Sequence, residues 1–220
     1  MGDLARRVSM ILRRLAMPKP KGETMRLGTS YGGWHVRAEG VRSGAIVYSG
    51  GVGEDASFDL ELIRRFGCEV WAFDPTPRAI AYAASINDER FHFFPVGLWS
   101  ADGPQTFFPP ADAEHVSHSI GNLQEVSGSA FTAECRSIQS LMRELGHDRI
   151  DLLKLDIEGA ELTVLAAVTG GEIAPSVLAV EFHPKSVVDT TRVLQIVRRL
   201  RKRGYRLLAE ENWDLTFVRP

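Results

Sequence analysis

From residue 44 onward, apolar runs alternate with amphipathic stretches. The apolar runs have the length of buried strands and lie at residues 46–49, 69–73, 91–98, 150–155 and 177–182. The stretches between them carry apolar side chains at helical spacing, at residues 58–66, 79–85, 137–145, 160–168 and 191–202. This alternation predicts βαβ units that form a parallel sheet. Two last apolar runs, residues 205–208 and 215–218, predict a closing hairpin.

Two segments depart from this alternation. Residues 100–135 contain Gly103-Pro104, Pro109-Pro110 and a polar run with His115 and His118. We interpret them as an insertion with a short strand, a loop that could close over a substrate, and a returning strand. Residues 1–43 read as a lead-in to a domain that covers residues 44–220.

The lead-in begins with a basic amphipathic pattern. Its apolar residues recur at helical spacing and are surrounded by arginines: Leu4, Val8, Ile11, Leu12 and Leu15. Arg13 and Arg14 interrupt the apolar run, and no small-residue cleavage pattern follows, so a secretory signal is not predicted. We expect a helix that packs on the domain or on a partner. The alternative is a weak peripheral contact with a membrane surface.

Composition and charge argue against nucleic-acid binding, a zinc site, a disulfide framework and a membrane span. The chain has 220 residues, 44% hydrophobic and 25% charged, which is ordinary for one globular domain. A net charge of -2 gives no overall attraction to nucleic acid, and the basic run at residues 198–203 fits a solvated helix face. Two cysteines outside any CxxC pair predict neither a zinc site nor a disulfide framework. We therefore expect a cytoplasmic protein without a nucleic-acid partner, and no run is long enough to span a bilayer.

The stretch IVYSGGVGED, residues 46–55, places a glycine-rich turn directly after the first predicted strand. Its spacing fits the dinucleotide fingerprint, and Asp74 follows about 20 residues later, where an acid that binds ribose hydroxyls belongs. A nicotinamide cofactor is therefore one interpretation.

Glu54 and Asp55 argue against a phosphate at this turn. Their carboxylates would stand beside the pyrophosphate at the helix N-terminus, where like charge is unfavourable. S-adenosylmethionine meets no such objection, because it carries an amine and a sulfonium and no phosphate. The plainer alternative is that the two acids only favour the start of the helix through its dipole.

A second group of charged residues follows the later strands. Asp156 ends a strongly apolar strand and Glu158 follows on the same side, where open α/β sheets bind ligands. His183 follows the next strand beside Glu181 and is a candidate general base. The alternatives are helix capping and surface charge for Asp156, and a loop histidine bonded to backbone for His183. These four side chains could also hold a divalent metal such as magnesium, but no metal is assigned.

Four stretches together resemble the FkbM-like branch of the class I S-adenosylmethionine-dependent methyltransferases. They are VYSGGVGEDASFDLEL (residues 47–62), EVWAFDPTP (69–77), VGLWSADG (96–103) and, most specific, LLKLDIEGAE (152–161). The resemblance implies a Rossmann-like α/β fold with a seven-stranded, mostly parallel sheet, helices on both faces and an antiparallel last strand.

The resemblance implies that Gly50, Gly51, Gly53, Asp74, Gly97, Leu98 and Asp156 lie at the cofactor. With the residues singled out above, the expected cofactor contacts are Ser49, Gly50, Gly51, Gly53, Glu54, Asp55, Asp74, Gly97, Leu98 and Asp156, and the expected catalytic residues are His183, Asp156 and Glu158. Two positions depart from the pattern. The first strand has Val47 and Tyr48 where an acid is common, which makes Glu54 or Asp55 a candidate partner for the cofactor's amine. Gly97 replaces an acid at the end of strand three, so adenine would rely on backbone groups or on Asp102.

These observations predict methyl transfer from S-adenosylmethionine to a hydroxyl of a sugar, a glycan or a secondary metabolite. The acceptor would be a small molecule or a glycan. The alternatives are a nicotinamide-dependent oxidoreductase and a domain that binds a cofactor or partner without catalysis. The sequence does not fix the oligomeric state.

Overall fold

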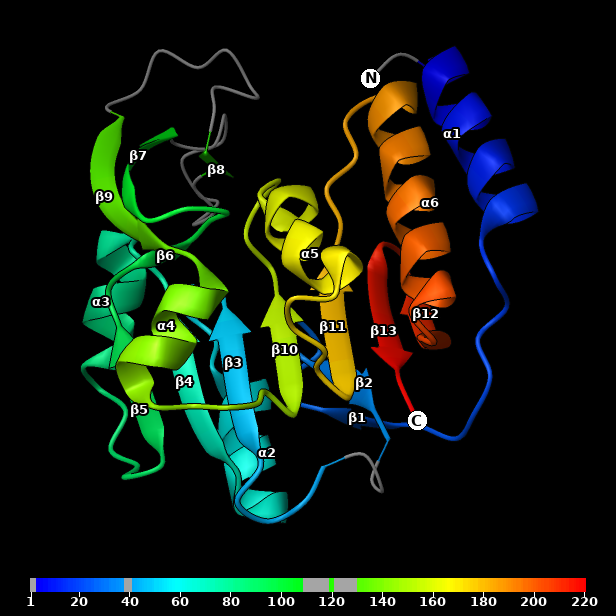
Figure 1. Ribbon diagram of the computed structural model, residues 1–220. Helices are drawn as coiled ribbons and strands as arrows, with labels where there is room; N and C mark the ends of the chain where they lie inside the picture. Colours follow the sequence, from blue (N-terminus) through cyan, green and yellow to red (C-terminus); the bar gives the residue numbers. More distant parts are fainter. Residues whose placement is uncertain (1–2, 38–40, 109–118, 121–129) are drawn as a thin grey trace.

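A computed structural model describes residues 3–37, 41–108, 119–120 and 130–220 of the chain (Figure 1). Its centre is a seven-stranded sheet in the order β12-β13-β11-β10-β3-β4-β5. The five inner and left-hand strands run parallel: β3 (Ile46–Gly50), β4 (Glu69–Phe73), β5 (Phe91–Phe94), β10 (Leu152–Leu155) and β11 (Val177–Glu181). The hairpin of β12 (Arg206–Glu211) and β13 (Asp214–Val218) closes the sheet, with β13 antiparallel to β11. The predicted fold class is confirmed.

Helices cover both faces of this sheet (Figure 1). One face packs against α4 (Ile138–Leu145), α5 (Glu161–Gly170) and α6 (Val187–Lys202). The other packs against α2 (Ser57–Phe66) and α3 (Pro77–Ala83). Because side chains alternate along a strand, β10 serves both cores: Leu153 and Leu155 belong to the first, Leu152 to the second. The burial of β10 on both faces explains its nearly continuous apolar sequence.

The segment predicted as one strand at residues 91–98 is two strands in different sheets. After β5 ends, Pro95 intervenes, and β6 (Gly97–Leu98) pairs in parallel with β9 (Phe131–Arg136). Proline lacks the N–H that a sheet ladder needs, which accounts for the break. A second sheet, in the order β6-β9-β7-β8, is therefore built from β7 (Gly103–Phe108), β8 (Ser119–Ile120) and β9. The insertion thus supplies the two predicted strands, while His115 and His118 lie outside the described residues.

Part of the lead-in belongs to the same core as the domain. The hairpin of β1 (Met25–Leu27) and β2 (Trp34–Val36) buries Leu27, Trp34 and Val36 among the residues around α2. The turn between these strands brings Tyr31 and Gly32 to the cavity described below.

The predicted N-terminal helix, α1 (Asp3–Ala16), lies alongside α6 (Figure 1). Arg13 fixes it to the closing hairpin, because its Nε donates to Glu210 at 2.8 Å and its guanidinium lies 4.5 Å from the Trp213 ring centre. Ser9 is buried, whereas Leu4, Ile11 and Leu15 are exposed. Packing on the domain is confirmed for one face of the helix, and membrane contact stays a prediction. Among the described residues, no helix has the length and apolarity to cross a bilayer.

Leu153→Ala should destabilise the protein, because Leu153 is fully buried in the core beneath α5 and α6. We expect a loss of about 2–5 kcal/mol in the free energy of unfolding, measured by urea denaturation. Leu4→Ala is the matched control at an exposed site and should change stability by less than about 0.5 kcal/mol. Equal effects of the two substitutions would contradict the assigned core.

Candidate functional site

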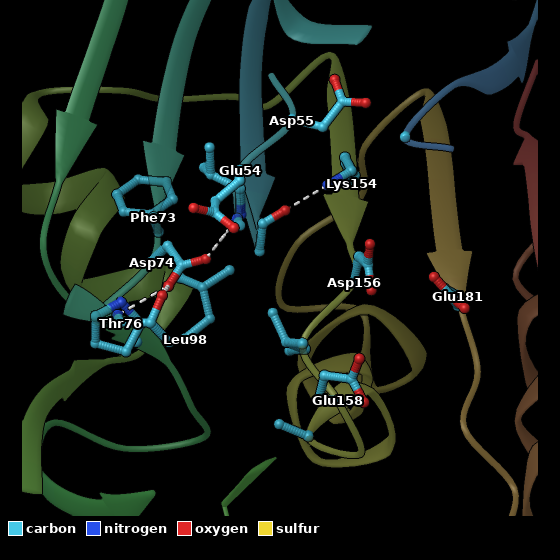
Figure 2. A pocket seen from close by; sticks show the side chains of 18 of the residues that line it. Glu54, Asp55, Phe73, Asp74, Thr76, Leu98, Lys154, Asp156, Glu158 and Glu181 are labelled. Atoms are coloured by element: carbon cyan, nitrogen blue, oxygen red, sulfur yellow. Dashed lines mark hydrogen bonds between the residues drawn. The ribbon is translucent and has the colours of Figure 1, made fainter. Parts of the chain in front are cut away.

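A cavity of about 420 Å³ lies at the carboxyl ends of β3, β4, β10 and β11 (Figure 2). Ligands of open α/β sheets bind at this edge, and the volume is within the usual range for small-molecule sites. Figure 2 shows Asp74 on one side of the cavity and Asp156 with Glu158 on the other. The glycine turn after β3 lies between them, so the two groups of residues singled out in the sequence face one space.

The glycine turn requires glycine at Gly51. This residue has φ +82°, and a Cβ placed there would lie 1.7 Å from the backbone oxygen of Asp156. The turn after β3 and the end of β10 are thus in backbone contact, and no larger residue fits between them. Gly53, with φ +54°, completes the turn and also lines the cavity.

Asp74 holds the amides of the glycine turn. Its Oδ2 accepts the N–H groups of Val52 and Gly53, both at 2.9 Å. Its Oδ1 accepts the N–H of Thr76 at 2.9 Å and the Thr76 hydroxyl at 2.7 Å (Figure 2). Asp74 is buried and lines the cavity, but both oxygens already accept two hydrogen bonds. Its predicted contact with ribose stays a prediction, and the structure gives it a positioning role.

Lys154 holds the other side of the turn. It lies within β10 with 4% of its surface exposed, and its ammonium donates to the Gly51 carbonyl at 2.5 Å. The buried Asp59 on α2 is its electrostatic partner: burial raises the pKa of Asp59, and the nearby Lys154 opposes that rise. A cation in an apolar strand is explained by these contacts.

Glu54 and Asp55 both line the cavity but differ in their partners. Asp55 accepts the Ser57 N–H at 2.8 Å at the start of α2 and the Thr29 hydroxyl at 2.5 Å. Burial alone would raise the pKa of Asp55, but these hydrogen bonds outweigh it and lower the pKa. Glu54 is half-exposed and pairs with Arg78 at 2.9 Å. The sequence alternative, support of the helix start, therefore applies to Asp55.

The wall on the β4 side is apolar. Gly97 and Leu98, which belong to β6, line it, and Phe73, Thr76 and Phe107 lie there as well. Their contact with adenine stays a prediction. Asp102, the other residue considered for adenine, accepts the Ser137 N–H at 2.8 Å before α4 and is not part of the cavity lining.

Two predicted cofactor contacts, Ser49 and Gly50, are not among the residues that line the cavity. Ser49 is fully buried within β3. A Cβ on Gly50 would lie 2.6 Å from the Leu98 side chain, so this glycine allows the cavity wall to pack closely on the strand. Their roles as direct contacts remain predictions that this packing does not favour.

The opposite side of the cavity gathers acidic side chains around His183. Asp156 follows β10, Glu158 lies in the next turn with φ +50°, and Glu181 ends β11 (Figure 2). The His183 Nδ1 donates to Glu161 at 2.9 Å, while its Nε2 lies 3.6 Å from Glu158 and 3.5 Å from Glu181. The tertiary structure therefore brings all three predicted catalytic residues together.

These groups change one another's protonation. Burial alone would lower the pKa of His183, but Glu161, which accepts from Nδ1, and the nearby Glu181 and Glu158 carboxylates outweigh it and raise the pKa to about 11. With a proton on each nitrogen the ring is a cation at neutral pH, which opposes its predicted role as general base. Burial, with Glu181 and Glu158 adding to it, raises the pKa of Asp156 to about 8. Burial would raise the pKa of Glu181, but His183 outweighs that effect and lowers it.

Sequence reasoning assigned no role to several residues of the site. Glu161 is buried at the start of α5 and binds His183, and Asp214 reaches the cavity from β13, where burial raises its pKa to about 6. Tyr31 and Gly32 come from the β1–β2 turn. Glu161 lies inside the LKLDIEGAE stretch, next to two predicted site residues. Tyr31, Gly32 and Asp214 reach the cavity only through long-range packing.

The sheet order, the glycine turn after the first parallel strand and the acidic residues after β10 define a Rossmann-like methyltransferase fold. A family model described as the methyltransferase FkbM domain matches residues 46–207, and the chain belongs to this family. Membership confirms the resemblance read from the sequence and, with it, S-adenosylmethionine as the expected cofactor.

Two individual proteins are also similar to the chain. It is 30% identical over 120 residues to the human "Probable methyltransferase-like protein 24", a match that covers 54% of this chain and 26% of that protein. The chain thus spans about a quarter of this relative's length. Among solved structures, fibrillarin from Aeropyrum pernix with natively bound S-adenosyl-L-methionine matches with a TM-score of 0.46 and 7% identity. That match covers 93% of this chain and 85% of the other.

Gly51→Ala should abolish cofactor binding, because its new methyl group would collide with the Asp156 backbone. Gly44→Ala is the matched control: Gly44 also has a positive φ, of +70°, but no atom lies within 4 Å of a Cβ there. An alanine is strained at either position, because both have a positive φ. The two variants therefore differ only in the collision with the Asp156 backbone. Calorimetric titration with S-adenosylmethionine should show loss for Gly51→Ala alone. Normal binding by that variant would contradict the contact.

Asp74→Asn should weaken S-adenosylmethionine binding at least about tenfold, because an amide cannot accept all four hydrogen bonds. If Asp74 acts by holding the turn, affinity for a 2′-deoxy analogue of the cofactor should fall by the same factor. A clearly smaller loss with the analogue would instead assign Asp74 to the ribose. Asp88→Asn is the control, since Asp88 accepts the Arg90 N–H in an exposed turn.

Proposed function

We propose that this protein transfers a methyl group from S-adenosylmethionine to a hydroxyl oxygen of a small molecule or glycan. Membership of the FkbM methyltransferase family supports the cofactor and the reaction class. The chemistry of the cavity supports the choice of a hydroxyl acceptor.

The charge of the cavity is the observation that carries the proposal. Its carboxylates outnumber its cations, which are Lys154 and, when protonated, His183. The carboxylates are Glu54, Asp55, Asp74, Asp156, Glu158, Glu181 and Asp214. Such a cavity suits a cofactor with a sulfonium and an amine, and it opposes the pyrophosphate of a nicotinamide dinucleotide.

The reaction is an in-line displacement at the methyl carbon. The acceptor oxygen forms a bond to this carbon as the carbon–sulfur bond breaks, which leaves S-adenosylhomocysteine, the methyl ether and one proton. The cofactor supplies the electrophile, so the protein must orient the hydroxyl and provide a site for its proton.

The two walls of the cavity divide these tasks. The glycine turn, held by Asp74 and Lys154, and the apolar wall around Leu98 support a role in cofactor binding. Asp156 and Glu158 face the space beyond the turn. Both are proposed to contact the acceptor hydroxyl, and Glu158 is proposed to receive its proton. Because the surrounding carboxylates keep His183 protonated, it is a partner of these carboxylates rather than the first acceptor of the proton.

Glu158→Gln should lower kcat by about a hundredfold, because an amide cannot accept the proton, and should leave the affinity for S-adenosylmethionine unchanged. The assay follows S-adenosylhomocysteine formation with a panel of sugars, glycans and hydroxylated small molecules. Asp148→Asn, at a side chain that is 89% exposed, is the control for loss of one carboxylate.

Parallel calorimetry with S-adenosylmethionine and NAD separates the alternatives. Binding of NAD without S-adenosylmethionine would favour an oxidoreductase and refute the proposal. Binding of S-adenosylmethionine with no transfer to any acceptor in the panel would instead indicate a binding domain without catalysis.

A further inference from the structure

Three side chains of different chemistry converge at the acidic side of the cavity. Asp156, Glu158 and His183 each offer one ligand atom, and these atoms all lie within 4.8 Å of one another. They come from the end of β10, the turn before α5 and the segment after β11, so the sheet itself brings them together. Figure 2 shows Asp156 and Glu158 on the same side of the cavity. Ligand atoms bound at ~2.0–2.2 Å to one divalent ion lie at most about 4.4 Å apart, so this spacing is close to what a single ion needs.

Glu161 binds the Nδ1 of His183 and leaves the Nε2 available for a ligand. This carboxylate is 1% exposed, accepts the Gly159 N–H at 2.9 Å, and accepts the His183 Nδ1–H at 2.9 Å. An ionised carboxylate only accepts, so the Nδ1 must carry the proton, and the Nε2 faces the cavity. Histidines that bind metals are oriented in this way, with a carboxylate on the nitrogen away from the ion.

The Nε2 has no close partner of its own among the described residues. Its nearest carboxylate oxygens belong to Glu181 at 3.5 Å and Glu158 at 3.6 Å, both beyond the usual 2.7–3.2 Å hydrogen-bond distance. Partly buried carboxylates that face one another repel unless a cation lies between them. A dication at this point would take the place of the Nε2 proton and be attracted by every neighbouring carboxylate.

We propose that Asp156, Glu158 and His183 bind a divalent first-row transition ion, with Glu161 as the positioning residue for His183. Two carboxylates would suit magnesium or manganese, but the imidazole favours manganese, iron or zinc over magnesium. If the methyl transfer proposed above is correct, the ion lies beside the cofactor, where it can hold the acceptor oxygen and make its proton more acidic.

Manganese is the probe for the test, because the spectrum of the free ion disappears on binding. The full chain is treated with a chelator, dialysed and titrated with MnCl₂ under electron paramagnetic resonance. We expect one saturable site per chain. Asp156→Asn, Glu158→Gln and His183→Gln should each weaken Mn²⁺ binding at least about tenfold, and Mg²⁺ should compete poorly.

Two further variants test the arrangement. Glu161→Gln should weaken Mn²⁺ binding about 10–100-fold, whereas a merely structural role would lower the melting temperature and leave the affinity unchanged. The Asp148→Asn variant lacks an exposed carboxylate near the amino-terminal end of β10, whereas the proposed site lies at the carboxyl end. This variant should bind Mn²⁺ as the unaltered chain does. Thermal melts by circular dichroism identify any variant that fails to fold. Of the three ligand variants, Glu158→Gln is expected to disturb folding least, because Glu158 is a half-buried turn residue.

Absence of saturable Mn²⁺ uptake by the unaltered chain would overturn the proposal. So would a site whose affinity does not change in any of the three ligand variants, since the ion would then lie elsewhere. Titration of the same samples with S-adenosylmethionine distinguishes failure of the proposed metal site from failure of the proposed methyl transfer. A chain that binds the cofactor but not Mn²⁺ refutes only the metal site, and a chain that binds Mn²⁺ without methyl transfer refutes only the proposed function.

Discussion

The position of the glycine turn between Asp74 and Lys154 is the constraint on which the site depends. A carboxylate at the end of β4 accepts the amides of Val52 and Gly53, and a buried ammonium on β10 binds the Gly51 carbonyl. Both are charge-assisted bonds in a buried setting, where such bonds are strong and their loss leaves an unpaired charge. Three neighbouring strands are thereby locked at their carboxyl ends, and the floor of the cavity is fixed.

This arrangement gives the two sides of the cavity different chemistry. The side near β4 and β6 is apolar and suits a flat ring, whereas the side near β10 and β11 holds carboxylates around one histidine. An enzyme that transfers a methyl group needs this division, because the cofactor must be held still while the acceptor atom is aligned with its methyl carbon. The insertion contributes to the apolar side through Phe107 on β7, so it is part of the site.

On the acidic side of the cavity, the carboxylates around His183 control both its protonation and its capacity to bind a cation. His183 is surrounded by carboxylates on both nitrogens, and the buried Glu161 fixes which nitrogen faces the cavity. Without a bound metal, the ring of His183 is a poor base, because the neighbouring carboxylates raise its pKa and hold its proton. The same neighbours make a strong site for a cation, and the proposed metal would turn an apparently unfavourable cluster into a functional one.

From residue 44 onward the sequence by itself determined the alternation of strands and helices, the glycine turn and the family, because these depend on local periodicity and on residue spacing along the chain. It also singled out Asp156, Glu158 and His183 as candidates. The tertiary structure decided what local signals do not carry: the break at Pro95 that moves Gly97 and Leu98 into a second sheet, the four hydrogen bonds of Asp74, and the contact between Glu161 and His183. These depend on residues distant in sequence meeting at one edge of a sheet, and no local pattern specifies which side chain will meet which partner there.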